Sequence, residues 1–133
     1  MSKAVLKTIK ESMKELGINY QFKKWKGHPK YPYFVGEYQE VEPMNEDGMQ
    51  ETSFIITGFS RCVDGNDANL QLEEAKENIA AYFPAVGGKV SIAENGSALA
   101  IFYAGSFANI PTGDAELEKI QINLTVKEWK VIT

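Results

Sequence analysis

The sequence predicts an α+β fold: a mainly antiparallel sheet with a long β-ribbon, packed by two amphipathic helices. Strand-like runs cover 31–41 and 51–61, and apolar residues recur at helical spacing in 3–16 and 70–83. Because strands follow one another without a helix after each, the sheet is expected to be antiparallel rather than doubly wound. The length of 133 residues fits a single domain spanning 1–133.

The ribbon in 31–61 is apolar on both of its faces. In its second run, Phe54 and Ile56 alternate with Ile55 and Phe59, so each pair lies on its own face. One face can lie on the chain's own helices, and the other then needs a second sheet or a second subunit. Either pair is therefore a candidate for burial between subunits, and packing beneath the chain's own helices is the competing explanation.

The ends of both helices carry recognisable signals. The helix in 3–16 has Ser2 available as N-cap, and Gly17 follows its last turn. The second helix has Asp67 or Asn69 to accept amide hydrogen bonds at its start. These signals place the helix boundaries to within a residue or two.

A hairpin and a long closing strand are expected after the second helix. Asn95–Gly96 is typical of a type I′ turn, in which both central residues need positive φ. The run 117–132 alternates cleanly between apolar and polar residues, so one of its sides is expected to be buried. Between them, 104–115 is rich in small residues and predicts a long loop anchored by Phe107 and Ile110.

The charge of the chain is unevenly distributed. Residues 1–30 hold eight lysines against two glutamates, a balance of +6, and the remainder holds six basic against sixteen acidic groups, a balance of −10. Such asymmetry suits head-to-tail contacts between copies, with Lys23 and Lys24 of one copy meeting Glu40 and Glu42 of the next. Plain solvation of both regions is the alternative explanation.

The segment 20–30 mixes lysines with aromatic residues, as surfaces that bind single-stranded nucleic acid do. A nucleic-acid-binding module is therefore the alternative function. The competing structural interpretation is an edge strand whose rings face inward and whose lysines discourage unwanted pairing. The acidic remainder of the chain favours that interpretation, because it would repel a polyanion.

No pattern of residues predicts catalysis, a cofactor or a metal site. His28 is the single histidine and Cys62 the single cysteine. Glu40 and Glu42 share a strand face and could form a carboxylate pair, although acids at the tip of a ribbon are more often solvated. No apolar run approaches the roughly 20 residues of a membrane helix, and charges interrupt the N-terminus too often for a signal peptide, so a cytoplasmic location is expected.

The order of elements resembles that of tail-terminator and minor tail proteins of long-tailed bacteriophages and prophages. The stretches Tyr31–Pro43 (YPYFVGEYQEVEP) and Pro111–Val131 (PTGDAELEKIQINLTVKEWKV) look like those of small proteins encoded in tail-gene clusters. The resemblance implies a non-enzymatic structural protein that closes into a homohexameric ring at the end of the tail tube. Such a ring stops tail polymerisation and helps head–tail joining.

The same resemblance implies the partners and the location. The partners would be further copies of the chain, the tail tube protein and the head–tail connector protein. The chain would be found in the cytoplasm of the bacterial host during assembly and in the virion tail afterwards. The candidates for contact with tube or connector are Glu46, Asp47, Phe107 and Ile110.

Overall fold

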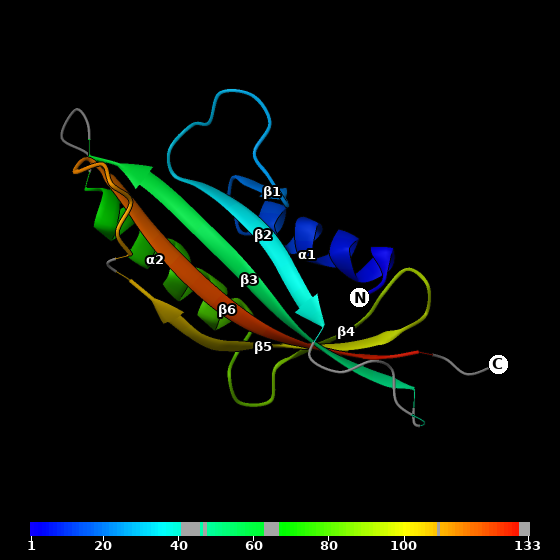
Figure 1. The fold of residues 1–133 in the computed structure, drawn as a ribbon. Coiled ribbons are helices and arrows are strands. Elements are labelled where there is room, and N and C mark those ends of the chain that lie inside the picture. Colours follow the sequence, from blue (N-terminus) through cyan, green and yellow to red (C-terminus); the bar gives the residue numbers. More distant parts are fainter. Residues whose placement is uncertain (41–45, 47, 63–66, 109, 131–133) are drawn as a thin grey trace.

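The computed structural model describes residues 1–40, 46, 48–62, 67–108 and 110–130. The elements are α1 (Lys3–Glu15), β1 (Tyr20–Phe22), β2 (Tyr33–Glu40), β3 (Met49–Arg61), α2 (Ala68–Tyr82), β4 (Lys89–Ile92), β5 (Ala98–Phe107) and β6 (Leu117–Trp129). The strands form one six-stranded sheet in the order β1-β2-β3-β6-β5-β4. Figure 1 shows both helices side by side behind this sheet. The fold is α+β with a mostly antiparallel sheet, as the sequence predicts, but β1 pairs with β2 in parallel.

The two helices begin and end where local chemistry places them. The Ser2 hydroxyl accepts a hydrogen bond from the first turn of α1, and Gly17, with φ of 72°, follows its end. The amide of Ile18 then donates to the carbonyl of Met13 at 2.9 Å, which satisfies an otherwise open carbonyl of the last turn. Of the two residues proposed for α2, Asp67 is the N-cap.

The core lies between the sheet and the two helices. Phe54 and Ile56 of β3 are 0% exposed. The other buried apolar side chains of this cluster include residues of both helices and of β6: Val5, Ile9, Met13, Leu72, Ile79, Ile120, Ile122, Leu124 and Val126. Phe54 and Ile56 are therefore not available between subunits, because the chain's own core contains them. The competing explanation holds for this face.

The expected ribbon is part of the sheet. β2 and β3 pair from Tyr33↔Phe59 to Glu40↔Thr52. β3 also pairs with β6 along its whole length of 13 residues, so that β3 and β6 form the centre of the sheet. Because β3 pairs with β2 on one side and with β6 on the other, the ribbon does not stand alone but forms part of the six-stranded sheet.

The hairpin is present, but its turn differs from the expected one. Only Gly96, with φ of 88°, has positive φ in this turn, and Asn95 does not. The amide of Gly96 donates to the carbonyl of Ala93, and the amide of Ala93 donates to the carbonyl of Ser97. The turn is thus one residue longer than a type I′ turn, and the glycine takes the left-handed position that closes it.

The loop expected over 104–115 is shorter in the structure. β5 continues to Phe107 after an irregularity in its pairing with β6 between Tyr103 and Ser106. Gly105, with φ of 101°, lies inside that irregularity and permits the extra residues to be accommodated. Phe107 is therefore a strand residue, and its neighbour across the sheet is Gln121.

Candidate functional site: the open face of the sheet

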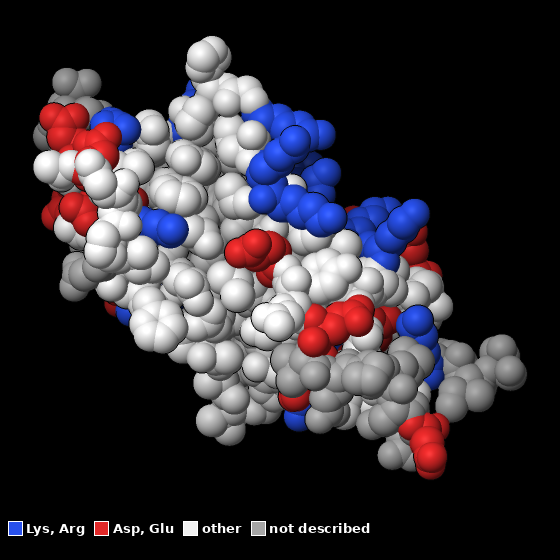
Figure 2. All heavy atoms as spheres, viewed as in Figure 1, with Lys and Arg blue, Asp and Glu red and all other residues white. Residues whose placement is uncertain are grey.

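One face of the sheet, here called the open face, points away from the helices. Along β3 the residues that alternate with the core are only partly buried, and Ile55 and Phe59 are among them. The register places side chains of β2, β6 and β5 beside them, namely Tyr33, Val35, Lys119, Gln121, Asn123, Thr125 and Phe107. Figure 2 shows this face as a broad area with few charged side chains. The face predicted to need a partner is thus the one that carries Ile55 and Phe59.

Aromatic side chains gather where the β1–β2 loop meets the open face. The ring of Tyr33 lies 5.1 Å from that of Trp25 and 5.0 Å from that of Phe59. The ammonium of Lys119 lies 5.6 Å from the centre of the Phe59 ring. The indole nitrogen of Trp25 is buried without a hydrogen-bond partner in the described part of the chain. Clustered Trp and Tyr side chains of this kind are enriched at protein interfaces.

A second apolar area lies at the β4 edge of the open face. Val90 and Ile92 are 71% and 68% exposed. Ile92 pairs with Ala98 of β5, and Ala98 pairs with Trp129 of β6, so these three side chains lie next to one another on the same face. The interface residues predicted from the sequence do not include Val90 and Ile92, because the alternation KVSI separates two faces of a strand without showing which one is exposed. Exposed aliphatic side chains on an edge strand are typical of a contact surface.

The end of β3 is held by Arg61. Its guanidinium lies 3.0 Å from the Asp114 carboxylate and 3.7 Å from that of Glu116. It also lies 5.7 Å from the centre of the Tyr31 ring. The backbone amide of Glu116 and then Arg61 lower the pKa of Asp114. Arg61 therefore ties the β1–β2 loop and the β5–β6 turn to the same strand end.

We expect Arg61→Gln to raise the pKa of Asp114 while leaving it below its ordinary value, because the amide of Glu116 still donates at 3.0 Å. A lowered pKa in the folded state stabilises the fold above the ordinary carboxyl pKa, and this contribution is lost as the pH falls through the folded-state value. Carboxyl titration by NMR measures the shift, with Lys119→Gln as control. An Asp114 pKa identical in both variants and the wild type would contradict this role of Arg61.

The remaining predicted interface residues are not brought together within one chain. Lys23 and Lys24 are exposed in the β1–β2 loop. Glu40 forms an ion pair of 2.6 Å with the α-amino group of Met1, and the hydrogen bond from this amino group lowers the pKa of Glu40. Glu42 lies outside the described residues. The acidic partner proposed for the two lysines is thus already engaged at Glu40.

The residues proposed to contact tube or connector are also dispersed. Phe107 is 62% exposed and lies on the open face. Ile110 is partly buried in the β5–β6 loop, and Glu46 is exposed at the opposite end of the sheet. Asp47 lies outside the described residues. Only Phe107 therefore joins the open face.

The rings of the basic segment 20–30 face the protein rather than the solvent. Phe22 stacks 6.0 Å from Tyr38 and 6.4 Å from the core ring of Phe54. Burial raises the pKa of Tyr20. This arrangement favours the edge-strand interpretation, because rings already packed in this way are not free to stack on bases.

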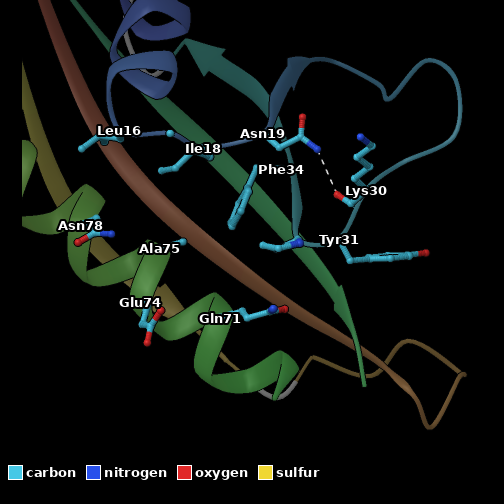
Figure 3. Close-up of a pocket in the computed structure, with 12 residues that line it drawn as sticks. Leu16, Ile18, Asn19, Lys30, Tyr31, Phe34, Gln71, Glu74, Ala75 and Asn78 are labelled. Atoms are coloured by element: carbon cyan, nitrogen blue, oxygen red, sulfur yellow. Dashed lines mark hydrogen bonds between the residues drawn. The ribbon is translucent and has the colours of Figure 1, made fainter. Parts of the chain in front are cut away.

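A groove separates the two helices on the other side of the sheet (Figure 3). It has a volume of about 500 Å³, and Phe34 and Ala75 are among the apolar residues that line it. Its polar side chains are those of Asn19, Lys30, Gln71, Glu74 and Asn78. The amide of Asn19 donates to the carbonyl of Lys30 at 3.1 Å, and the oxygen of Gln71 accepts from Ser60. The groove combines amides with the ammonium group of Lys30 and the carboxylate of Glu74, and it holds no histidine or cysteine among these lining residues.

The described residues include neither a metal-binding cluster nor a membrane-spanning helix. In that part of the chain, no group of three His, Cys, Asp or Glu side chains is arranged to hold a metal ion. The same residues include no helix with the length and apolar character needed to cross a membrane.

Comparison with known proteins defines the fold. No protein-family model and no curated protein matches the chain. Several solved structures are similar; one of them has a TM-score of 0.68 at 14% sequence identity, and the match covers 100% of this chain and 99% of that one. At this level of identity the likeness shows a shared fold over the whole length. The chain is thus an α+β protein with one helix-covered and one open sheet face.

Proposed function

We propose that this chain is a structural protein of a phage or prophage tail, of the tail-terminator kind, whose copies close into a ring at the end of the tail tube. The observation that carries the proposal is the open face, where apolar side chains such as Ile55, Phe59 and Phe107 are left partly or largely exposed by the single chain. A protein that works by assembly needs such a surface. The proposed partners are further copies of the chain, the tail tube protein and the head–tail connector, in the host cytoplasm and then in the virion.

The size of the open face supports assembly. The strands β2, β3, β5 and β6 have 8, 13, 10 and 13 residues, so they average about 36 Å in length at about 3.3 Å per residue, and side by side they are about 19 Å wide. The product is about 700 Å², close to the roughly 800 Å² that each partner contributes to a standard protein interface. The open face is therefore large enough to form a stable contact with another protein.

Measurement of the molar mass in solution tests the proposal. We expect the wild-type chain to form a closed oligomer, a hexamer in the simplest case, when light scattering is recorded during size-exclusion chromatography. Ile55→Asp should reduce this oligomer, because it places a charge in the open face. Val86→Asp is the matched control, because Val86 is 92% exposed in the loop between α2 and β4, outside the strands of that face. A wild-type chain that remains monomeric up to high concentration would count against the ring.

The proposed action on tail tubes has its own measurement. The tube protein encoded by the same genome should polymerise into shorter tubes, capped at one end, when the wild-type chain is added. Addition of the Ile55→Asp variant should leave the tubes as long as they are without any added chain. Electron microscopy of negatively stained tubes measures both. Equal tube lengths with and without the wild-type chain would contradict a terminating role.

Binding of single-stranded nucleic acid is the second candidate function. The exposed Lys23, Lys24 and Lys26 favour it, whereas the inward-facing rings do not. A real contact with phosphates must weaken steeply as the salt concentration rises. Retention on single-stranded DNA that falls with salt and is lost in Lys24→Ala/Lys26→Ala would support this function over assembly.

A further inference from the structure

The free positive charge of the chain gathers on one surface. All eight lysines of the first 30 residues are exposed, and Glu11 and Glu15 are the acids among them, which leaves +6. This basic surface consists of Lys3, Lys7, Lys10, Lys14, Lys23, Lys24, Lys26 and Lys30. Within the described residues only Lys7 of this set forms an ion pair, with Glu94. Figure 2 shows lysines grouped at the upper right.

Negative charge gathers at a different place, where β3 ends. The Ser60 hydroxyl lies 2.6 Å from the Gln71 oxygen of α2, and Arg61 pairs with Asp114 before β6, so both segments meet at this strand end. The acidic end consists of Asp67, Glu73, Glu74, Glu77, Asp114, Glu116 and Glu118. With Arg61, Lys76 and Lys119 counted, seven acids against three bases leave −4. Figure 2 shows acidic side chains at the upper left, over the β5–β6 turn.

The two surfaces are not paired within the single chain. In the described part of the chain, no ion pair joins the basic surface to the acidic end, although Lys30 and Glu74 line the same groove between the helices. Two copies that met basic surface to basic surface would repel each other, and so would two acidic ends. Contact of the basic surface with the acidic end is the arrangement in which the charges attract, and it also speeds association.

We infer that the basic surface of one copy docks on the acidic end of the next, in a head-to-tail contact that rests on the proposed assembly of this chain and specifies it. The contact is heterologous, because each copy offers a different surface to each neighbour, and such contacts form a ring when the rotation from copy to copy closes. The acidic end takes the place of Glu40 as the partner of the lysines. The open face is then free to contribute apolar contacts beside the charged ones.

Two charge-reversal variants test the inference. Lys10→Glu/Lys14→Glu/Lys24→Glu/Lys26→Glu changes the charge of the basic surface from +6 to −2, and Glu74→Lys/Glu77→Lys/Glu118→Lys changes that of the acidic end from −4 to +2. None of the seven side chains forms an ion pair in the described residues, and only that of Glu118 is partly buried, so the substitutions should leave the fold intact, which circular dichroism checks. We expect each variant alone to associate about tenfold or more weakly than the wild type at 0.15 M salt, since like charges now meet.

A 1:1 mixture of the two variants should recover an oligomer of the wild-type mass, because every contact then joins an acidic to a basic surface. Lys130→Glu is the control, because Lys130 is exposed and lies outside both charged surfaces and beyond the strands of the open face. Undiminished assembly of either variant, or a mixture that stays monomeric, would overturn the head-to-tail contact while wild-type assembly still supports the proposed function. A wild-type chain that never assembles would overturn both.

Discussion

Replacing Phe54 with alanine is expected to lower the free energy of unfolding by about 3–5 kcal/mol, the usual cost of truncating a buried phenylalanine. Phe54 is 0% exposed and lies in the same core cluster as residues of α1 and α2. The substitution removes apolar surface from the core and leaves a cavity that the central strand β3 cannot close by moving. Denaturation by urea, followed by circular dichroism, measures the loss.

The matched control is Ile55→Ala, the next residue of the same strand. Ile55 points to the open face and is only partly buried, so its truncation should cost no more than about 1 kcal/mol in the single chain. In the assembled form, Ile55→Ala should cost more stability than in the single chain, because a partner would then cover Ile55. If Phe54→Ala and Ile55→Ala lowered the unfolding free energy of the monomer equally, the two faces of β3 would not differ in burial as the structure describes.

The second large effect is expected at Gly58. This residue pairs with Phe34 across β2 and β3, and a methyl group added to it would overlap the Phe34 ring and lie 3.1 Å from Ile120. Phe34 is only 1% exposed, so its ring has no room to move away. Gly58→Ala should therefore cost about 1–3 kcal/mol through overpacking, although alanine is ordinarily better than glycine in a strand.

A double-mutant cycle isolates this contact. Phe34→Leu shortens the side chain that covers the glycine, so Gly58→Ala should cost less in the Phe34→Leu background than in the wild type. Thr57→Ala, one residue away on the open face, is the surface control and should cost little. Additive losses for Gly58→Ala and Phe34→Leu would show that the ring is not what excludes a side chain at position 58.

The local elements could be predicted from the sequence because their signals are local. The order of helices and strands, Ser2 and Asp67 as N-caps and Gly17 at the end of α1 follow from residue types at fixed spacing. The alternation in β6 likewise predicts its buried side, because Ile122 and Leu124 are apolar while their neighbours are polar. For the candidate site, the same reasoning identified Ile55 and Phe59 as candidates for burial between subunits, but it could not distinguish them from Phe54 and Ile56.

The exposed residues of β4 show why a strand pattern can mislead. Lys89 and Ser91 alternate with Val90 and Ile92, and the usual expectation buries the two aliphatic side chains. In the structure Val90 and Ile92 are the exposed pair, while Lys89 lies over the ring of Tyr82 with its ammonium 3.4 Å from the ring centre. The neighbouring strand and α2 decide the orientation, and neither is visible in four residues of sequence.

By itself the sequence determined the fold class, the order of the elements, the helix ends and the uneven charge of the chain. Only the tertiary structure decided which face of β3 became core, which strands lie at the edges, and that the α-amino group of Met1 engages Glu40 while no lysine of the first 30 residues forms an ion pair with the described acidic end at Arg61. The reason is physical: alternation with a period of two defines two faces of a strand, but the long-range packing of helices selects the one that is buried.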